Sequence, residues 1–268
     1  MVVFPHCKIN LGLQIVSKRA DGYHNIETCF YPVPWTDILE IIKAEKFSFS
    51  SSGLDIPGNP EDNLCIKAYR LLQRDFNLSP VQIHLHKVIP AGAGLGGGSS
   101  DAAFTLRTLN SIFNLGLSAQ QLLTYAAQLG SDCSFFVEDK PMLGSGRGEI
   151  LSEVNLSLKG MFLILVKPDI HVSTAAAFAG IKPKQSNASL SEILSLPLSE
   201  YRSVLINDFE ESVFQKYPSI ASIKESMYQH GALYASLSGS GASVFGIFNS
   251  PVDLKNYFPG MVYWMGML

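Results

Sequence analysis

The sequence predicts a mixed fold of strands and helices, with a domain boundary near residue 155. Three observations predict it. Apolar and polar residues alternate over 81–89, apolar residues recur at helical spacing over 102–113, and five glycines lie between them within 92–98. At 268 residues the chain is long enough for one large domain or two modest ones, with a buried core in either case.

The composition excludes several classes of protein. Apolar residues make up 47% of the chain and charged residues 16%, which is typical of a compact protein rather than a disordered one. A net charge of -3 argues against a nucleic-acid-binding surface. No apolar run suits a signal peptide or a bilayer span. Four cysteines without a C-x-x-C pair argue against a zinc site or a disulfide framework, so we expect a reducing cytoplasm. A monomer and a homodimer both stay open.

The first predicted strand covers residues 8–15 and alternates between two faces. Lys8 and Asn10 share one face, so both side chains can reach one ligand. The alternative is an outer sheet face in contact with water. Residues 26–42 predict two further strands, arranged around Pro32–Trp35.

A predicted turn at Asp21-Gly22 comes directly before two ring side chains. Tyr23 offers a surface for stacking, and His24 offers a hydrogen-bond donor or acceptor near neutral pH. The alternative is an aromatic residue packed beneath the loop.

The segment 90–103 is the strongest site signal in the chain. It joins the predicted strand at 81–89 to the predicted helix at 102–113, and its glycines let a ligand approach the backbone closely. The start of the helix adds unpaired N–H groups and a positive dipole end. We therefore predict an anion site, most plausibly for phosphates. The alternative is a flexible turn in which Ser100 or Asp101 merely caps the helix.

Two other glycine signatures fit this segment less well. The spacing G-x-G-x-x-G of a dinucleotide site begins at Gly92, yet residues 102–131 contain no acidic residue to hold a ribose. A Walker A loop requires a lysine after its second glycine, whereas Gly98 and Ser99 follow Gly97.

Further helices are predicted at 64–76, with Asn63 as N-cap, and at 118–129. Asp132 follows the second of these helices and is the one carboxylate within 102–137. Its alternative role is to cap a short following turn. The second half of the chain predicts a strand at 161–166, a polar loop at 182–189, helices at 191–195, 198–206 and 219–229, and a strand–turn–strand unit at 233–248.

Six segments, in this order, resemble the GHMP superfamily of small-molecule kinases. They are KINLGL at 8–13, RADGYH at 19–24, EDNL at 61–64, PAGAGLGGGSSDAA at 90–103, LGSD at 129–132 and SGSGA at 238–242. The glycine loop combined with Ala-Asp-Gly-Tyr-His resembles the members that act on a cytidine-linked alcohol. The resemblance runs through nearly the whole chain and is thinnest at 43–58 and 180–200.

The resemblance implies an α+β, two-domain GHMP kinase fold. It places a ribosomal-S5-like, ATP-binding domain at 1–155 and a ferredoxin-like domain that contributes to the substrate site at 156–268. It implies ATP and Mg²⁺ as cofactors, with no side chain assigned to the metal. It also implies transfer of the γ-phosphoryl group to the 2-hydroxyl of CDP-methylerythritol, a small molecule of the non-mevalonate isoprenoid route.

The resemblance assigns roles by position. Asp132 is the expected catalytic carboxylate, and Lys8 is its partner, which favours the ionised carboxylate and opposes charge on the transferring group. The implied substrate-binding residues are Asn10, Tyr23, His24 and Phe178. Two of those rings stack on the cytosine and the imidazole forms hydrogen bonds with it. The implied nucleotide-binding residues are Asn63, near the adenine, and Pro90, Gly92, Gly94, Leu95, Gly96, Gly97, Gly98, Ser99 and Ser100.

Three other functions remain as alternatives. A GHMP kinase for homoserine or mevalonate has no use for the cytosine-binding rings. A nucleotide-binding regulator without catalysis needs neither Lys8 nor Asp132. A dinucleotide-dependent oxidoreductase lacks the acidic residue that would hold the ribose.

Overall fold

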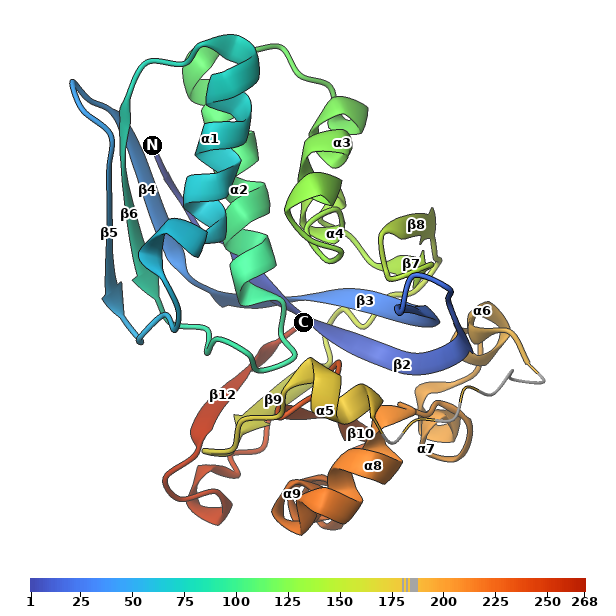
Figure 1. Cartoon of the computed structure of the whole chain (residues 1–268). Helices are drawn as coiled ribbons and strands as arrows, with labels where there is room; N and C mark the ends of the chain where they lie inside the picture. The colour runs from blue at the N-terminus through green and yellow to red at the C-terminus, as the bar shows by residue number, and fades with distance from the viewer. Residues whose placement is uncertain (180, 182, 184–187) are drawn as a thin grey trace. The chain divides into compact units, whose positions relative to one another are not determined.

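The structure is a computed structural model, and it describes residues 1–179, 181, 183 and 188–268. The chain divides into two compact units (Figure 1). The first unit comprises Met1–Cys7, Trp35–Ala91 and Gly96–Lys140, and the second comprises Lys8–Pro34, Gly92–Leu95 and Pro141–Leu268. Because these segments interleave, a single boundary at 155/156 stays a prediction. The predicted loop at 182–189 lies mostly outside the described residues.

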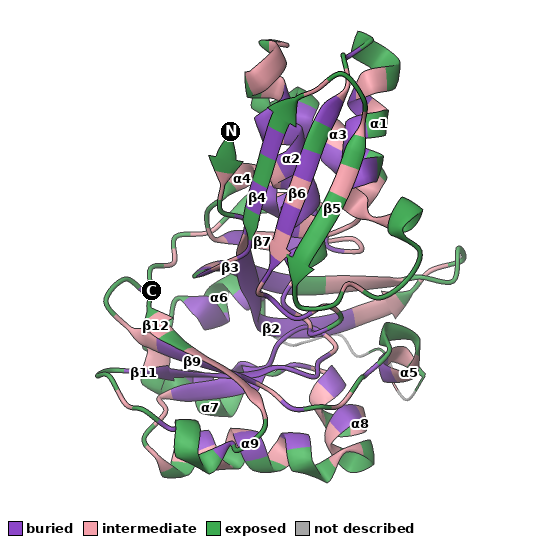
Figure 2. Ribbon diagram, turned by 90° about the vertical axis from the view of Figure 1, so that its left-hand side faces the viewer, coloured by how far each residue is buried: buried purple, intermediate pink, exposed green. Residues whose placement is uncertain are grey.

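The first unit contains a four-stranded sheet in the order β1-β4-β6-β5. Its strands are β1 (Val2–Val3), β4 (Ile38–Lys43), β5 (Ser48–Gly53) and β6 (Val81–Lys87). Residues along β4 and β6 alternate between buried and more exposed, as Figure 2 shows. One face of the sheet therefore contributes to the core, where Leu39, Ile83 and Leu85 are buried.

Helices supply the rest of that core. They are η1 (Pro60–Asp62), α1 (Leu64–Phe76), α2 (Gly97–Phe113), α3 (Ala119–Leu129) and α4 (Phe135–Glu138). The predicted cap of α1 is confirmed, because Asn63 Oδ1 accepts a hydrogen bond from Cys65 N at 2.9 Å. Leu106 and Leu109 of α2 are fully buried, so the helical spacing of the apolar residues is confirmed as well.

A second sheet has the order β2-β3-β7-β8, and most of it belongs to the second unit. Its strands are β2 (His6–Lys18), β3 (His24–Thr36), β7 (Met142–Ser145) and β8 (Ile150–Glu153). The predicted interruption at Pro32–Trp35 is wrong, since β3 continues to Thr36. The pairing of β3 with β7 ends at Phe30. Beyond Phe30 the edge of β3 that faced β7 needs no backbone N–H for this pairing, so proline is tolerated there.

The third sheet is antiparallel throughout, with the order β10-β11-β9-β12. Its strands are β9 (Phe162–Lys167), β10 (Tyr234–Leu237), β11 (Val244–Phe248) and β12 (Val262–Met267). The helices of this unit are α5 (Thr174–Phe178), α6 (Leu190–Leu194), η2 (Leu198–Glu200), α7 (Tyr201–Val204), α8 (Phe209–Lys216), α9 (Pro218–Gln229) and η3 (Lys255–Tyr257). The predicted helix 198–206 is two short turns that end at Val204. Among the residues described, every helix is too short or too polar to cross a membrane.

Candidate active site

The glycine loop joins β6 to α2 and changes unit twice, with Gly92–Leu95 in the second unit and its flanks in the first. Gly94 and Gly96 have φ angles of 77° and 70°, a left-handed conformation that side chains other than glycine rarely adopt. The predicted helix start at 102 is wrong, because α2 begins at Gly97. Ser100 and Asp101 therefore lie inside the helix and cap nothing. Gly96 at the N-cap has no side chain to bond the free N–H groups of the first turn.

The first turn of α2 has room on one side and none on the other. A Cβ at Gly97 would lie 3.0 Å from both Ile89 Cγ2 and Lys87 Nζ, whereas a Cβ at Gly98 would have nothing within 4 Å. Ser100 is fully buried, and its Oγ has no hydrogen-bond partner among the described residues. Open space, free N–H groups and an unsatisfied hydroxyl together fit a bound anion.

A buried ion cluster underlies this turn, and the sequence analysis missed it. Lys87 Nζ donates to Asp37 Oδ2 at 2.5 Å and to Asp101 Oδ2 at 2.7 Å. Asp37 Oδ1 also accepts from the backbone N–H groups of Val88 and Ile89. Burial raises the pKa of Asp101 to about 7, although Lys87 opposes the change. The cluster fixes the end of β6 against α2. The sequence did contain a signal for Lys87. In the alternating pattern of β6, Lys87 occupies a position on the buried face of the strand.

Lys8 and Asn10 lie in β2 with exposed fractions of 3% and 1%, so the alternative of a solvated face is wrong. Lys8 Nζ donates to Asn10 Oδ1 at 2.5 Å and to the Gly94 carbonyl at 3.0 Å. The structure thus brings these two predicted residues together with the glycine loop. Neutral acceptors of this kind fix the position of an ammonium group without neutralising its charge.

The turn at Ser238 also contacts Gly94. Ser238 Oγ donates to the Gly94 carbonyl at 2.9 Å, and a Cβ at Gly94 would overlap the Ser238 carbonyl. Asn207 is fully buried and donates from Nδ2 to the carbonyls of Leu237 and Gly239, at 2.9 Å each. In the sequence, the Ser238 turn stands out only through the family resemblance, and Asn207 belongs to no recognisable motif.

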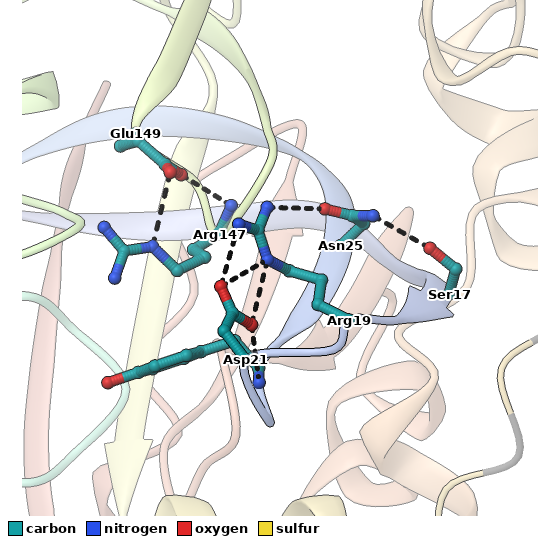
Figure 3. A network of polar contacts seen from close by, with 7 residues as sticks. Ser17, Arg19, Asp21, Asn25, Arg147 and Glu149 are labelled. Atoms are coloured by element: carbon teal, nitrogen blue, oxygen red, sulfur yellow. Dashed lines mark hydrogen bonds and ion pairs between the residues drawn. The ribbon is translucent and has the colours of Figure 1, made fainter.

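Tyr23 lies on the predicted turn and has an exposed fraction of 56%, so it is not packed beneath a loop. Its backbone N–H donates to Asp21 Oδ1 at 3.1 Å, and the Arg19 side chain donates to both oxygens of the same carboxylate (Figure 3). The hydrogen bond from Arg19 holds the pKa of Asp21 below its ordinary value. These contacts order the turn before any ligand binds.

A second arginine lies over the ring of Tyr23. The Arg147 guanidinium carbon is 5.1 Å from the ring centroid, a cation–π geometry. Glu149 accepts from the backbone N–H of Arg147 at 2.5 Å and from its Nε at 3.3 Å (Figure 3). Arg147 therefore covers one face of the Tyr23 ring.

His24 and Phe178 are far apart in the sequence but stack on each other, with ring centroids 4.6 Å apart and planes at 13°. Phe178 also meets Phe209 edge-on at 4.8 Å. A third ring does not fit between rings at that separation. The structure therefore places Phe178 as a support for the imidazole, and its face towards His24 is already occupied.

Two further predicted residues of the first unit, Asp132 and Asn63, stay predictions as ligand contacts. Asp132 is half-buried in the turn between α3 and α4. It does not cap α4, because Ser134 holds that position. Its partnership with Lys8 also stays a prediction, since Lys8 belongs to the second unit. Asn63 uses its side-chain oxygen to cap α1. Among the residues described, no group of three or more His, Cys, Asp or Glu is arranged to hold a metal ion.

Comparison with known proteins defines the class. Residues 63–139 match the GHMP kinases N terminal domain, and residues 184–257 match the GHMP kinases C terminal domain. The chain therefore belongs to the GHMP kinase family, and the predicted α+β fold of that family is confirmed.

Within the family, the chain belongs with the 4-diphosphocytidyl-2-C-methyl-D-erythritol kinases. It is 53% identical over 251 residues to the protein of that name from Cytophaga hutchinsonii, covering 93% of each chain. It is 55% identical over 253 residues to the one from Bacteroides fragilis, covering 93% of this chain and 92% of the relative. A crystal structure of a 4-(cytidine 5'-diphospho)-2C-methyl-D-erythritol kinase superposes with a TM-score of 0.84 at 27% identity, covering 99% and 98% of the two chains.

Proposed function

We propose that this chain is an ATP-dependent kinase that phosphorylates the 2-hydroxyl of CDP-methylerythritol, a step in isoprenoid precursor synthesis by the non-mevalonate route. The identity of 53–55% to relatives named for this activity, over almost the whole chain, supports the reaction. One structural observation supports the residues most directly. Lys8 and Asn10 are buried polar side chains, and Lys8 bonds the glycine loop itself.

The nucleotide would lie at the glycine loop and the start of α2. ATP supplies the transferred phosphoryl group when bound, and Mg²⁺ offsets the charge of its phosphates. The N–H groups of Gly97 and Gly98 can donate to phosphate oxygens, since the first turn of a helix leaves them without intrahelical partners. Ser100 Oγ, buried and unsatisfied among the described residues, supplies a further donor in the same turn.

The acceptor hydroxyl needs a group that orients it and takes its proton. We assign Asp132 to this role, because a carboxylate within reach of a hydroxyl performs both tasks. Lys8 stabilises the negative charge that spreads over the transferring group, and Asn10 orients the acceptor. The hydrogen bonds of Lys8 to Asn10 and Gly94 hold its ammonium in place before the substrates bind, so little reorganisation is needed during the reaction.

Specificity for cytidine would come from the ordered turn at Tyr23. The exposed ring can stack on a base, since Arg147 covers its other face. The imidazole of His24, supported by Phe178, can form hydrogen bonds with the polar edge of cytosine. An aromatic surface that is already ordered binds with a smaller loss of conformational entropy.

The decisive experiment is a phosphorylation assay on the purified full-length chain with ATP, Mg²⁺ and CDP-methylerythritol. We expect phosphorylation of this substrate and not of homoserine or mevalonate. Tyr23→Ala should raise the KM for CDP-methylerythritol by roughly tenfold or more, which is the value of base stacking, and leave the KM for ATP unchanged. Tyr257→Ala is the matched control, because Tyr257 is 58% exposed and contacts His230.

Two results contradict the proposal in different ways. Phosphorylation of mevalonate or homoserine without CDP-methylerythritol turnover would overturn the substrate. Weaker ATP binding in Tyr23→Ala would place Tyr23 at the nucleotide rather than at the cytosine.

A further inference from the structure

Thr28 is a fully buried polar residue in β3, and no role in the reaction has been assigned to it above. Its hydroxyl connects two residues of β2. Oγ1 donates to the Gly12 carbonyl at 2.6 Å, and Asn10 Nδ2 donates to Oγ1 at 2.9 Å. Thr28 is fully buried, and its hydroxyl is already bonded to Gly12 and Asn10, so it is not available to a ligand. Any effect of Thr28 on the reaction must therefore pass through its partners.

The hydroxyl has a single proton, which decides the direction of these bonds. A backbone carbonyl can only accept, so the Thr28 proton points at Gly12 and the oxygen must accept from its other neighbour. That neighbour is the side-chain amide of Asn10, whose NH₂ group must face Thr28. The opposite end of the amide, Oδ1, is then turned towards Lys8.

The contact with Lys8 independently requires the same orientation of the Asn10 amide. An ammonium group has only donors, so it must meet Oδ1 of Asn10 and not Nδ2. If the amide flipped, an NH₂ group would face the ammonium at 2.5 Å and Thr28 would lose its donor. Two donor–acceptor requirements at opposite ends therefore fix one rotamer of Asn10.

The other end of the connection is fixed by the backbone. Gly12 has a φ angle of 68° within β2, a left-handed residue of the kind that forms a bulge in a strand. A Cβ at Gly12 would lie 2.6 Å from Leu205 Cδ1, so a larger residue would force the Leu205 side chain to move. A rigid, buried carbonyl is a fixed reference point for the Thr28 hydroxyl.

We propose that Thr28 is a positioning residue for the phosphoryl transfer: it orients the Asn10 amide, and through Asn10 it holds the Lys8 ammonium against the glycine loop. This inference rests on the proposed function, since Lys8 and Asn10 act in that reaction. The connection runs from the Gly12 carbonyl through Thr28 and Asn10 to Lys8, each link a hydrogen bond of 2.9 Å or less.

The test compares Thr28→Val with Thr28→Ser in the full-length chain. Valine keeps the shape but removes the hydroxyl, so the Asn10 amide loses its acceptor and its single orientation. We expect kcat to fall by roughly 10- to 100-fold, the effect of a small misplacement, with the KM for ATP and for CDP-methylerythritol nearly unchanged. Thr28→Ser keeps the hydroxyl and should restore kcat.

The double variant Thr28→Val/Asn10→Ala isolates the route of the effect. If Thr28 acts through Asn10, the double variant should have the kcat of Asn10→Ala alone. Thr105→Val is the matched control, because Thr105 is also fully buried and its hydroxyl donates to a backbone carbonyl. It should lose stability comparably and keep its kcat.

A readout without turnover separates this inference from the reaction itself. The side-chain amide signals of Asn10 in NMR spectra, assigned by their loss in Asn10→Ala, should be protected from exchange in the wild type and in Thr28→Ser. They should lose that protection in Thr28→Val. Unchanged amide protection in Thr28→Val overturns the inference even if the kinase assay fails. If the enzyme is active, equal kcat values for Thr28→Val and the wild type also overturn the inference.

Discussion

Two lysines are buried to the same extent, each with an exposed fraction of 3%, and each touches the glycine loop. Lys87, in the first unit, donates to the carboxylates of Asp37 and Asp101. Lys8, in the second unit, donates to the amide oxygen of Asn10 and the carbonyl of Gly94. The two differ in the charge of the groups that hold them.

That difference separates a structural lysine from one suited to catalysis. Burial alone lowers the pKa of Lys87, but Asp101 and Asp37 outweigh burial, so the pKa is raised above its ordinary value. The carboxylates of Asp37 and Asp101 offset the charge of the ammonium, and their bonds with it hold the end of β6 against α2. Within its unit, Lys8 donates to an amide oxygen and a backbone carbonyl, which bind an ammonium group through their dipoles and not through a full negative charge. Burial alone therefore does not distinguish the two lysines, whereas the acceptors within their own units do.

The largest effect we expect is on turnover, in Asp132→Asn. The amide keeps the shape and a hydrogen bond but removes the base, so kcat should fall by about 10²- to 10⁴-fold while both substrates still bind. Lys8→Met should also lower kcat, and the two losses should not add, since both residues serve one transition state. Single-turnover phosphoryl transfer in both single variants and the double variant measures this.

The outcome decides whether the comparison of the two lysines has a functional meaning. A near-wild-type rate in Asp132→Asn would remove Asp132 from the reaction. Additive losses would show that Lys8 and Asp132 act independently, and Lys8 would then be a buried residue of ordinary structural importance.

The next effect is on stability, in Lys87→Met. Removal of the ammonium leaves two buried carboxylates without a counter-charge, so the free energy of unfolding should fall by about 3–5 kcal/mol. Lys8→Met is the matched control and should lose less, because its bonds to Asn10 Oδ1 and to the Gly94 carbonyl leave neutral groups behind when the ammonium is removed. Urea unfolding monitored by circular dichroism gives both values.

A rescue variant keeps this prediction testable if Lys87→Met does not fold. Adding Asp101→Asn removes one of the two uncompensated charges, so the double variant Lys87→Met/Asp101→Asn should be more stable than Lys87→Met. If the double variant is no more stable, charge balance is not what the cluster contributes.

The sequence predicted the elements whose side chains repeat with a period. The strand at 81–89, the helix at 64–76 and the shared face of Lys8 and Asn10 follow from spacing alone. For Tyr23 the sequence left two possibilities, an exposed ring or a ring packed beneath the loop. The exposed fraction of 56% shows that the ring is exposed.

The sequence could not show contacts that join distant segments. The stacking of His24 on Phe178 spans two elements with no common pattern, and so does the ion cluster of Asp37, Lys87 and Asp101. The start of α2 was misplaced because two glycines are poor helix formers. Glycine nevertheless occupies the first position of α2, because a Cβ there would lie 3.0 Å from both Lys87 Nζ and Ile89 Cγ2.

The smallest effect we expect, counted per pH unit, is a pH dependence of stability that originates in Asp101. Burial, aided by the charge of Asp37 and opposed by Lys87, raises the pKa of this carboxyl from 3.8 to about 7. Between those two values the folded chain binds a proton that the unfolded chain has released. Stability due to Asp101 is therefore full at low pH and is lost as the pH rises through about 7.

Asp101→Asn removes this titration and keeps an oxygen to accept from Lys87. The stability of the variant relative to wild type should therefore increase as the pH rises from about 4 to 7 and level off above that range. The change should be at most about 1.4 kcal/mol per pH unit, which corresponds to roughly 3–6 °C in Tm per pH unit. Thermal unfolding of both chains across this range measures it, with Asp75→Asn as an exposed control. Parallel stability curves would mean that Asp101 stays ionised throughout, and that Lys87 compensates both carboxylates fully even without water.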